Sequence, residues 1–144
     1  MIIFIFLFGG TIYTTLEILW RGYSHISMFI LSGIISIFIA LLNDTAYTYE
    51  MDFRLQILIS TIFTTLGEGL VGILVNRILH LNVWCYEGLF GTFFLGQCNI
   101  FFVFIWGIIC TFGIVLLDFI EYKFFNGQRP YYKIGNRIIF EIKE

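Results

Sequence analysis

Charged residues are scarce in this 144-residue chain. They make up 12% of it, against 59% hydrophobic and 20% aromatic residues. A small water-soluble domain cannot bury so large an apolar share beneath a polar surface. The composition therefore excludes an ordinary soluble protein and predicts an integral membrane protein.

The sequence also lacks the common motifs of catalysis and metal binding. It has no CxxC, no HExxH, no Ser-His-acid arrangement and no GxxxxGK[ST] phosphate loop, so it does not hydrolyse ATP by that route. Its three cysteines have no metal-type spacing, and we assign no disulfide to Cys85 and Cys98. We expect no enzyme activity, no cofactor and no metal. Nucleic acid is not an expected partner, because the basic residues near the C-terminus alternate with Glu141 and Glu144.

Four apolar stretches are each close to the roughly 20 residues that a membrane-spanning helix needs. They cover about residues 2–20, 26–42, 55–79 and 100–119. They predict an all-α, four-helix transmembrane domain over residues 1–121, followed by a basic cytoplasmic tail over 122–144. The first stretch lacks the basic start and small-residue cleavage site of a secretory signal, so we expect it to remain as a span.

Basic residues predict the orientation of these spans. With four spans, both termini share one side, which carries six basic residues against only Arg21 and Arg77 opposite; the six are Arg54, Lys123, Arg129, Lys133, Arg137 and Lys143. Because cytoplasmic loops carry an excess of Lys and Arg, both termini are predicted to be cytoplasmic. The expected location is the cytoplasmic membrane, which the chain crosses several times.

The chain contains a candidate internal repeat. The segment TIYTTLE at 11–17 resembles TIFTTLGE at 61–68, and Gly33-Ile34-Ile35 aligns with Gly107-Ile108-Ile109, as does Asp44 with Asp118. Two helical hairpins related by an axis along the membrane normal would explain this similarity. The alternative is chance resemblance among apolar helices built from few residue types.

Glu68 is the main functional candidate, because it lies near the middle of the 55–79 stretch. A carboxylate at bilayer depth costs at least about 2.5 kcal/mol on insertion scales, so it usually faces protein, a partner or water. Polar and small residues recur every four positions around it and form one slanting helix face: Gln56, Ser60, Thr64, Glu68, Gly72, Asn76 and His80.

This face has two interpretations. In the first, Ser60, Gly69 and Gly72 allow helices to approach closely, and the polar groups only hold helices together. In the second, Glu68 binds a proton or substrate with Thr64 and Asn76. Gln would supply hydrogen bonds without the charge, so a functional role is favoured for Glu68 itself.

Two other regions are less specific. Glu17 is four residues before Arg21, the spacing of a surface ion pair; the alternative is an acid that shares a cavity with Glu68. The segment from His80 to Asn99, which we call the outer segment, is rich in aromatic residues and glycine, Trp84 and Tyr86 among them. It is predicted to be either an interfacial anchor or a re-entrant lid, because irregular backbone at membrane depth requires protein or a wet cavity around it.

Several of these residues together resemble a known family. They are Glu17, Ser27-Met28-Phe29 with Gly33, Glu68 with Gly72, Val75 and Asn76, Val83-Trp84-Cys85-Tyr86, Gly96-Gln97 and Trp106. The pattern resembles the ABC-transporter type IV, or CmpB-like, membrane proteins over about residues 9–122. The resemblance implies a permease that works with a separate ATPase.

The sequence therefore predicts a small permease-like protein of the lipid bilayer with an acidic site inside the membrane. It would act as a homo-oligomer or within a larger membrane complex, since four helices make a thin wall for a pathway. One alternative is a homodimeric proton-coupled exporter with one acid per protomer. Another is a structural or lysis-type assembly protein without a substrate.

Overall fold

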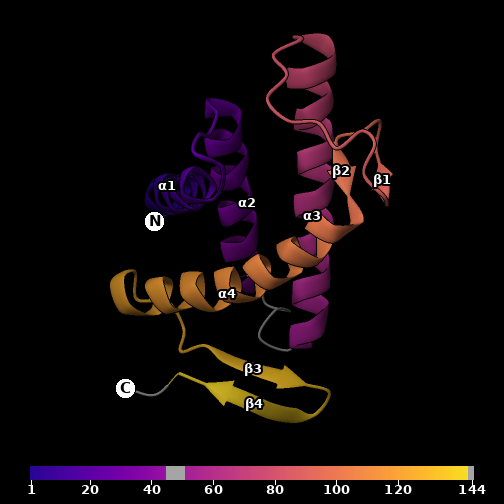
Figure 1. Ribbon diagram of the computed structural model, residues 1–144. Coiled ribbons are helices and arrows are strands. Elements are labelled where there is room, and N and C mark those ends of the chain that lie inside the picture. The colour runs from indigo at the N-terminus through magenta and orange to yellow at the C-terminus, as the bar shows by residue number, and fades with distance from the viewer. Residues whose placement is uncertain (45–50, 143–144) are drawn as a thin grey trace.

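The computed structural model describes residues 1–44 and 51–142, with side chains for all of these except Asn43 and Asp44. Lys143 and the side chain of Asp44, which entered the predictions above, lie outside this part. The described residues form four α-helices: α1 Ile2–Arg21, α2 Ile26–Asp44, α3 Phe53–Gly72 and α4 Ile100–Phe124 (Figure 1). A π-helix, η1 Ile73–Ile78, continues α3 without a break. The predicted helices are thus confirmed, with α4 running to Phe124 rather than Phe119.

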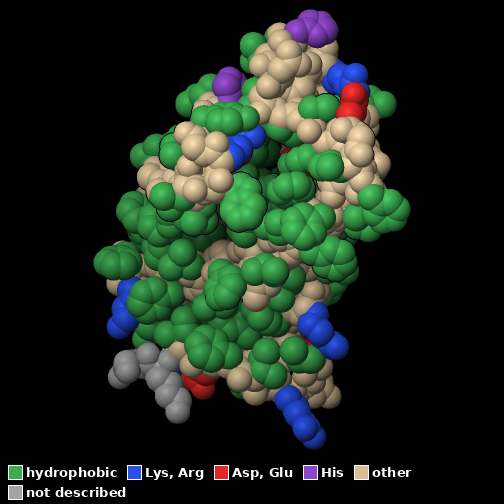
Figure 2. Space-filling model, in the orientation of Figure 1, with side chains coloured by type: hydrophobic (Ala, Val, Ile, Leu, Met, Phe, Trp, Pro, Cys, Tyr) green, Lys and Arg blue, Asp and Glu red, His purple; other side chains and the backbone are tan. Residues whose placement is uncertain are grey.

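Within the described residues, three stretches are long and apolar enough to cross a membrane: Ile2–Arg21, Phe53–Ile78 and Ile100–Phe124. The apolar part of α2, Ile26–Leu42, is shorter. In Figure 2 apolar side chains cover the middle of the visible face, and charged and histidine side chains gather toward its two ends. Such a surface suits a protein that is surrounded by lipid at its middle and by water at its ends.

The helices do not form a simple parallel bundle. In Figure 1, α3 stands upright and α4 runs across its lower half. Helices α1 and α2 pack closely because glycines without side chains lie at their contact. A Cβ on Gly10 would lie 2.8 Å from the Phe29 ring, and one on Gly33 would lie 2.6 Å from Phe6. Residues of α1, α2 and α4 then share one apolar cluster that includes Ile5, Ile39 and Ile114.

The candidate repeat stays a hypothesis. Thr14 and Thr64 each donate a hydroxyl hydrogen bond to the carbonyl four residues earlier, but threonines in many helices do so. A short turn joins α1 to α2, whereas the whole outer segment separates α3 from α4.

Short strands make the fold less purely helical than the sequence predicts. In the outer segment, β1 Thr92–Phe93 pairs with β2 Cys98–Asn99. After α4, β3 Tyr131–Ile134 pairs with β4 Arg137–Glu141 as an antiparallel hairpin, which we call the C-terminal hairpin. Neither sheet was predicted.

The C-terminal hairpin is attached to the helices rather than being a simple tail. Tyr132 is 2% exposed, and its hydroxyl donates to Asp118 Oδ2 of α4 at 2.6 Å. Asp52 begins α3 by accepting from the backbone N–H of Arg54, and its other carboxylate oxygen accepts from the N–H of Gly135 at 2.7 Å. The predicted basic tail is therefore an ordered part of the fold within the described residues.

Candidate functional site

The polar face of α3 points into the protein. Six of its seven members are buried and only His80 is exposed, beyond the end of the helix. A four-residue step drifts by about 40° on an α-helix. Because a π-turn takes more residues than an α-turn, η1 reverses this drift and keeps Asn76 on the buried side.

Glu68 lies at the centre of this face and is 2% exposed. Each carboxylate oxygen accepts one hydrogen bond from an aromatic side chain. The Tyr86 hydroxyl donates to Oε1 at 3.0 Å, and the Trp106 indole N–H donates to Oε2 at 2.9 Å. The acid is thus held by the outer segment on one side and by α4 on the other.

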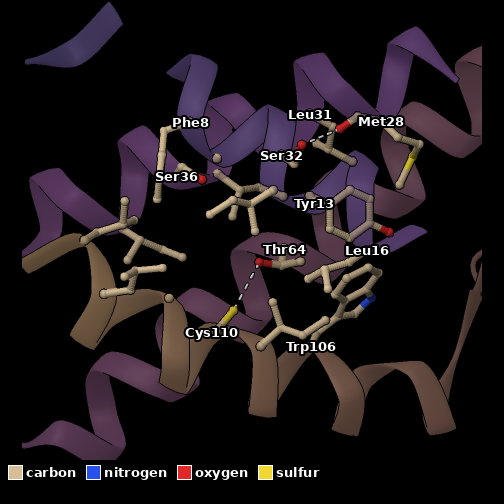
Figure 3. Close-up of a pocket in the computed structure, with 18 of the residues that line it drawn as sticks. Phe8, Tyr13, Leu16, Met28, Leu31, Ser32, Ser36, Thr64, Trp106 and Cys110 are labelled. Atoms are coloured by element: carbon tan, nitrogen blue, oxygen red, sulfur yellow. Dashed lines mark hydrogen bonds between the residues drawn. The ribbon is translucent and has the colours of Figure 1, made fainter. Parts of the chain in front are cut away.

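A cavity of about 110 Å³ lies beside Glu68 and is lined by all four helices. Figure 3 shows Phe8 and Ser36 toward one end of it and Tyr13 and Trp106 toward the other. Most of the lining is apolar, with hydroxyl groups from Ser32, Ser36 and Thr64. Of the described residues that line it, Glu68 is the one acid.

Thr64 lines the cavity, but its hydroxyl hydrogen is used in a hydrogen bond within α3. Its hydroxyl donates to the Ser60 carbonyl at 2.8 Å and lies 3.5 Å from the Cys110 sulfur. Cys110 is 2% exposed, as expected for a small buried hydrophobe. The Ser60 hydroxyl is buried and, within the part of the chain that the structure describes, has no hydrogen-bond partner.

Glu17 does not line this cavity. Its carboxylate lies 2.7 Å from the Arg21 guanidinium, and it accepts a hydrogen bond from the Ser24 hydroxyl. The ion pair with Arg21 is the arrangement that the four-residue spacing predicts.

Asn76 fixes the outer segment to η1 rather than facing the cavity. Its amide donates to Gln97 Oε1 at 2.7 Å, and its Oδ1 accepts from the Val83 backbone N–H at 2.6 Å. The Trp84 indole N–H donates to the Gln97 carbonyl at 3.1 Å. Asn76, Gln97 and Trp84 therefore form one buried network that holds the outer segment on η1, and Tyr86 of the same segment donates separately to Glu68.

The outer segment reaches far along α3. The Cys98 thiol donates to the carbonyl of Thr65 at 3.5 Å. Thr65 is thirteen residues before the end of η1, roughly 20 Å at 1.5 Å per residue. A strained turn with Phe94 and Leu95 both at positive φ allows the chain to reverse here.

Two of the predicted helix-packing residues have a different neighbour from the expected one. A Cβ on Gly69 would lie 2.6 Å from the Phe94 ring, and one on Gly72 would lie 2.8 Å from the Gln97 side chain. Both glycines thus make room for the outer segment, not for another helix. The outer segment can approach the backbone of α3 this closely because glycine has no side chain.

Burial also affects the ionisable groups of the outer segment. It raises the pKa of Tyr86, and the nearby Glu68 raises it further, so the phenol stays protonated as a donor. It raises the pKa of the Cys98 thiol to about 12, again with a contribution from Glu68. Cys98 is therefore an unreactive thiol while the segment stays in place.

Tyr13 and Trp106 were not predicted from composition or spacing to be site residues. Trp106 appeared only in the family pattern. A signal was present, because a tryptophan inside a span, away from the interface, needs a buried partner for its indole N–H. The rings of Tyr13 and Trp106 lie 5.6 Å apart between their centroids.

The fold and site thus describe a mostly helical protein with an acid and a small cavity between its apolar helices. No family model matches the sequence, and no curated protein or solved structure is significantly similar to it. The resemblance to the CmpB-like family accordingly stays a hypothesis.

Proposed function

We propose that this chain is a small permease-like membrane protein in which Glu68 binds a proton or a small cation during transport. The observation that supports this most is the Glu68 carboxylate beside a cavity lined by all four helices. A residue that only joined helices would need no adjacent space.

The charges around Glu68 favour a positively charged ligand. Among the ion pairs of the described residues, none involves Glu68. The side chains that donate to it, Tyr86 and Trp106, are neutral, and so is the nearby Cys98 thiol. A buried carboxylate without a basic partner requires either a proton or a bound cation.

The cavity limits the size of the ligand. At about 110 Å³ it is smaller than an apolar cavity of roughly 150 Å³, which takes benzene. A proton with a few waters, or a small alkylammonium ion next to the Tyr13 and Trp106 rings, suits this volume. A large amphiphilic drug does not.

The outer segment would act as the outer cover of the site, because Tyr86 is a direct partner of Glu68. Four helices of one chain line the cavity, so a second protomer is not needed to complete it. A separate ATPase, implied by the family resemblance, would have to supply any energy from ATP, since this sequence has no phosphate loop.

The test is proton flux into vesicles that contain a pH-sensitive dye. Wild type, Glu68→Gln and Glu17→Gln are reconstituted, and an external acid pulse is applied to vesicles with and without internal tetramethylammonium chloride, because a proton that enters by exchange needs a cation that leaves. We expect wild type and Glu17→Gln to change the internal pH faster than protein-free vesicles, and Glu68→Gln to match those vesicles.

Size-exclusion profiles show whether each variant is still assembled. A Glu68→Gln protein that is assembled and as active as wild type would contradict the proposal, as would a wild type inactive in both conditions. A flux that requires tetramethylammonium would identify exchange against a small cation rather than proton movement alone.

A further inference from the structure

A second hollow lies at the other end of the molecule, between α4 and the C-terminal hairpin. It is an open groove of about 710 Å³, within the roughly 300–1,000 Å³ of small-molecule sites. Its walls are four residues of α4, the last two residues of β4 and the residue after β4: Phe112, Val115, Leu116, Phe119, Phe140, Glu141 and Ile142. We call it the hairpin groove.

The α4 wall of this groove belongs to a candidate membrane span, Ile100–Phe124. Phe112 is 72% exposed and Phe119 is also exposed, so this wall faces outward rather than toward the other helices. On β4, three consecutive apolar residues, Ile138, Ile139 and Phe140, are exposed. An exposed apolar groove beside a membrane span is open to lipid chains.

Two basic residues border the groove, Lys123 by its position on α4 and Arg129 by its contacts. Lys123 is four residues after Phe119, which places it one turn further on the same helix face. Arg129 contacts two groove residues, because its Nε donates to the Ile142 carbonyl at 2.8 Å and lies 3.6 Å from Glu141 Oε1. Because Glu141 lines the groove and pairs with Arg129, the Lys123, Arg129 and Glu141 side chains together carry one net positive charge, which is complementary to an acyl chain attached to an anionic headgroup.

We propose that the hairpin groove binds an anionic phospholipid, with one acyl chain against Phe112 and Phe119 and the phosphate near Lys123 and Arg129. The inference does not depend on the proposed role of Glu68. Of the described residues, Leu116 alone lines both hollows.

The probes are a phosphatidylglycerol and a phosphatidylcholine with the same oleoyl chains, added to the full chain in detergent. Native mass spectrometry measures the fraction of protein that retains each lipid. Wild type is expected to retain phosphatidylglycerol in preference to phosphatidylcholine. Lys123→Gln is expected to lower that preference about fivefold, since one basic residue near a membrane surface contributes about 1 kcal/mol.

Two further variants locate the effect. Arg137→Gln removes a charge from the start of β4, outside the groove, and is expected to keep most of the preference. Val115→Phe fills the groove without changing any charge and is expected to reduce retention of both lipids. Size-exclusion profiles confirm that each variant is folded.

Equal retention of the two lipids by wild type would overturn the proposal. An equal loss in Arg137→Gln and Lys123→Gln would overturn it too, because the attraction would then be general to this end of the molecule. A lipid-free dimer that Val115→Phe disrupts would show that a second copy of the chain occupies the groove instead.

Discussion

The guanidinium of Arg21 donates a hydrogen bond to the carbonyl oxygen of Val83 over 3.3 Å. Arg21 ends α1, and Val83 belongs to the outer segment that follows η1. The turn after α1 and the outer segment therefore lie at the same end of the protein. Since α3 starts at the opposite end, α2 leads the chain back toward that end, although its apolar part is short (Figure 1).

This contact leads to a prediction about topology. Cys85 is the exposed cysteine of the outer segment, and Cys98 and Cys110 are buried. We expect a membrane-impermeant maleimide to label wild type in intact cells through Cys85. In a Cys85→Ser background, Tyr23→Cys should label in the same way, and Asn136→Cys only after the membrane is opened.

Each arm of this experiment can fail separately. Labelling of Asn136→Cys in intact cells would reverse the predicted orientation. A Tyr23→Cys protein protected in intact cells would show that α2 does not cross the membrane. The Cys85→Ser protein without an added cysteine is the control.

A second prediction concerns the support of Glu68. Trp106→Phe keeps a ring but removes the N–H that Glu68 Oε2 accepts, so we expect the free energy of unfolding to fall by about 1–3 kcal/mol. Thermal unfolding in detergent measures it. Trp20→Phe is the matched control, because Trp20 is 83% exposed. Equal stability of the two variants would mean that the indole hydrogen bond does not hold the acid.

A third prediction concerns the packing of the outer segment on α3. Gly72→Ala adds a Cβ only 2.8 Å from the Gln97 side chain, so the segment must move away. We expect Cys98, which is buried in wild type, to react faster with a thiol reagent. Gly107→Ala is the control, since its Cβ would lie 3.7 Å from the nearest atom, an ordinary contact. If Cys98 stays protected in Gly72→Ala, the segment is not held by this close approach.

A fourth prediction concerns pH. The Arg54 side chain, followed by the Gly135 backbone N–H, lowers the pKa of Asp52. A lowered folded-state pKa means that the contribution of Asp52 is present above the unfolded value of about 3.9 and is lost as the pH falls below it. We expect Asp52→Asn, which keeps a helix-capping side chain, to lose less stability than wild type between pH 5 and pH 3.

The measurement for Asp52 is the unfolding temperature across this pH range at low and high salt. Because Asp52 is partly exposed to solvent, the difference between the two proteins should shrink at high salt. Parallel curves for wild type and Asp52→Asn would show that Asp52 does not attach the C-terminal hairpin through its charge.

The sequence alone determined the mostly helical character of this protein and the positions of its helices, and it predicted the membrane as their surroundings. Uninterrupted apolar length sets a helix in a membrane protein, because the backbone must satisfy its own hydrogen bonds there. The buried face of α3 was also readable, since its polar residues repeat every four positions from Gln56 to Asn76. Glu68 was identifiable because it is a charged residue within a long apolar stretch.

Only the tertiary structure decided what surrounds Glu68. Tyr86 is 18 and Trp106 is 38 residues away in sequence, and no periodicity relates them to the acid. Gly69 and Gly72 were predicted to pack against another helix. Small residues permit close approach by any neighbour, and the sequence does not identify that neighbour as the outer segment. The C-terminal hairpin was missed for a related reason: its attachment depends on Asp52 and Asp118, which are distant in sequence, and long-range contacts of this kind arise only when the chain is folded.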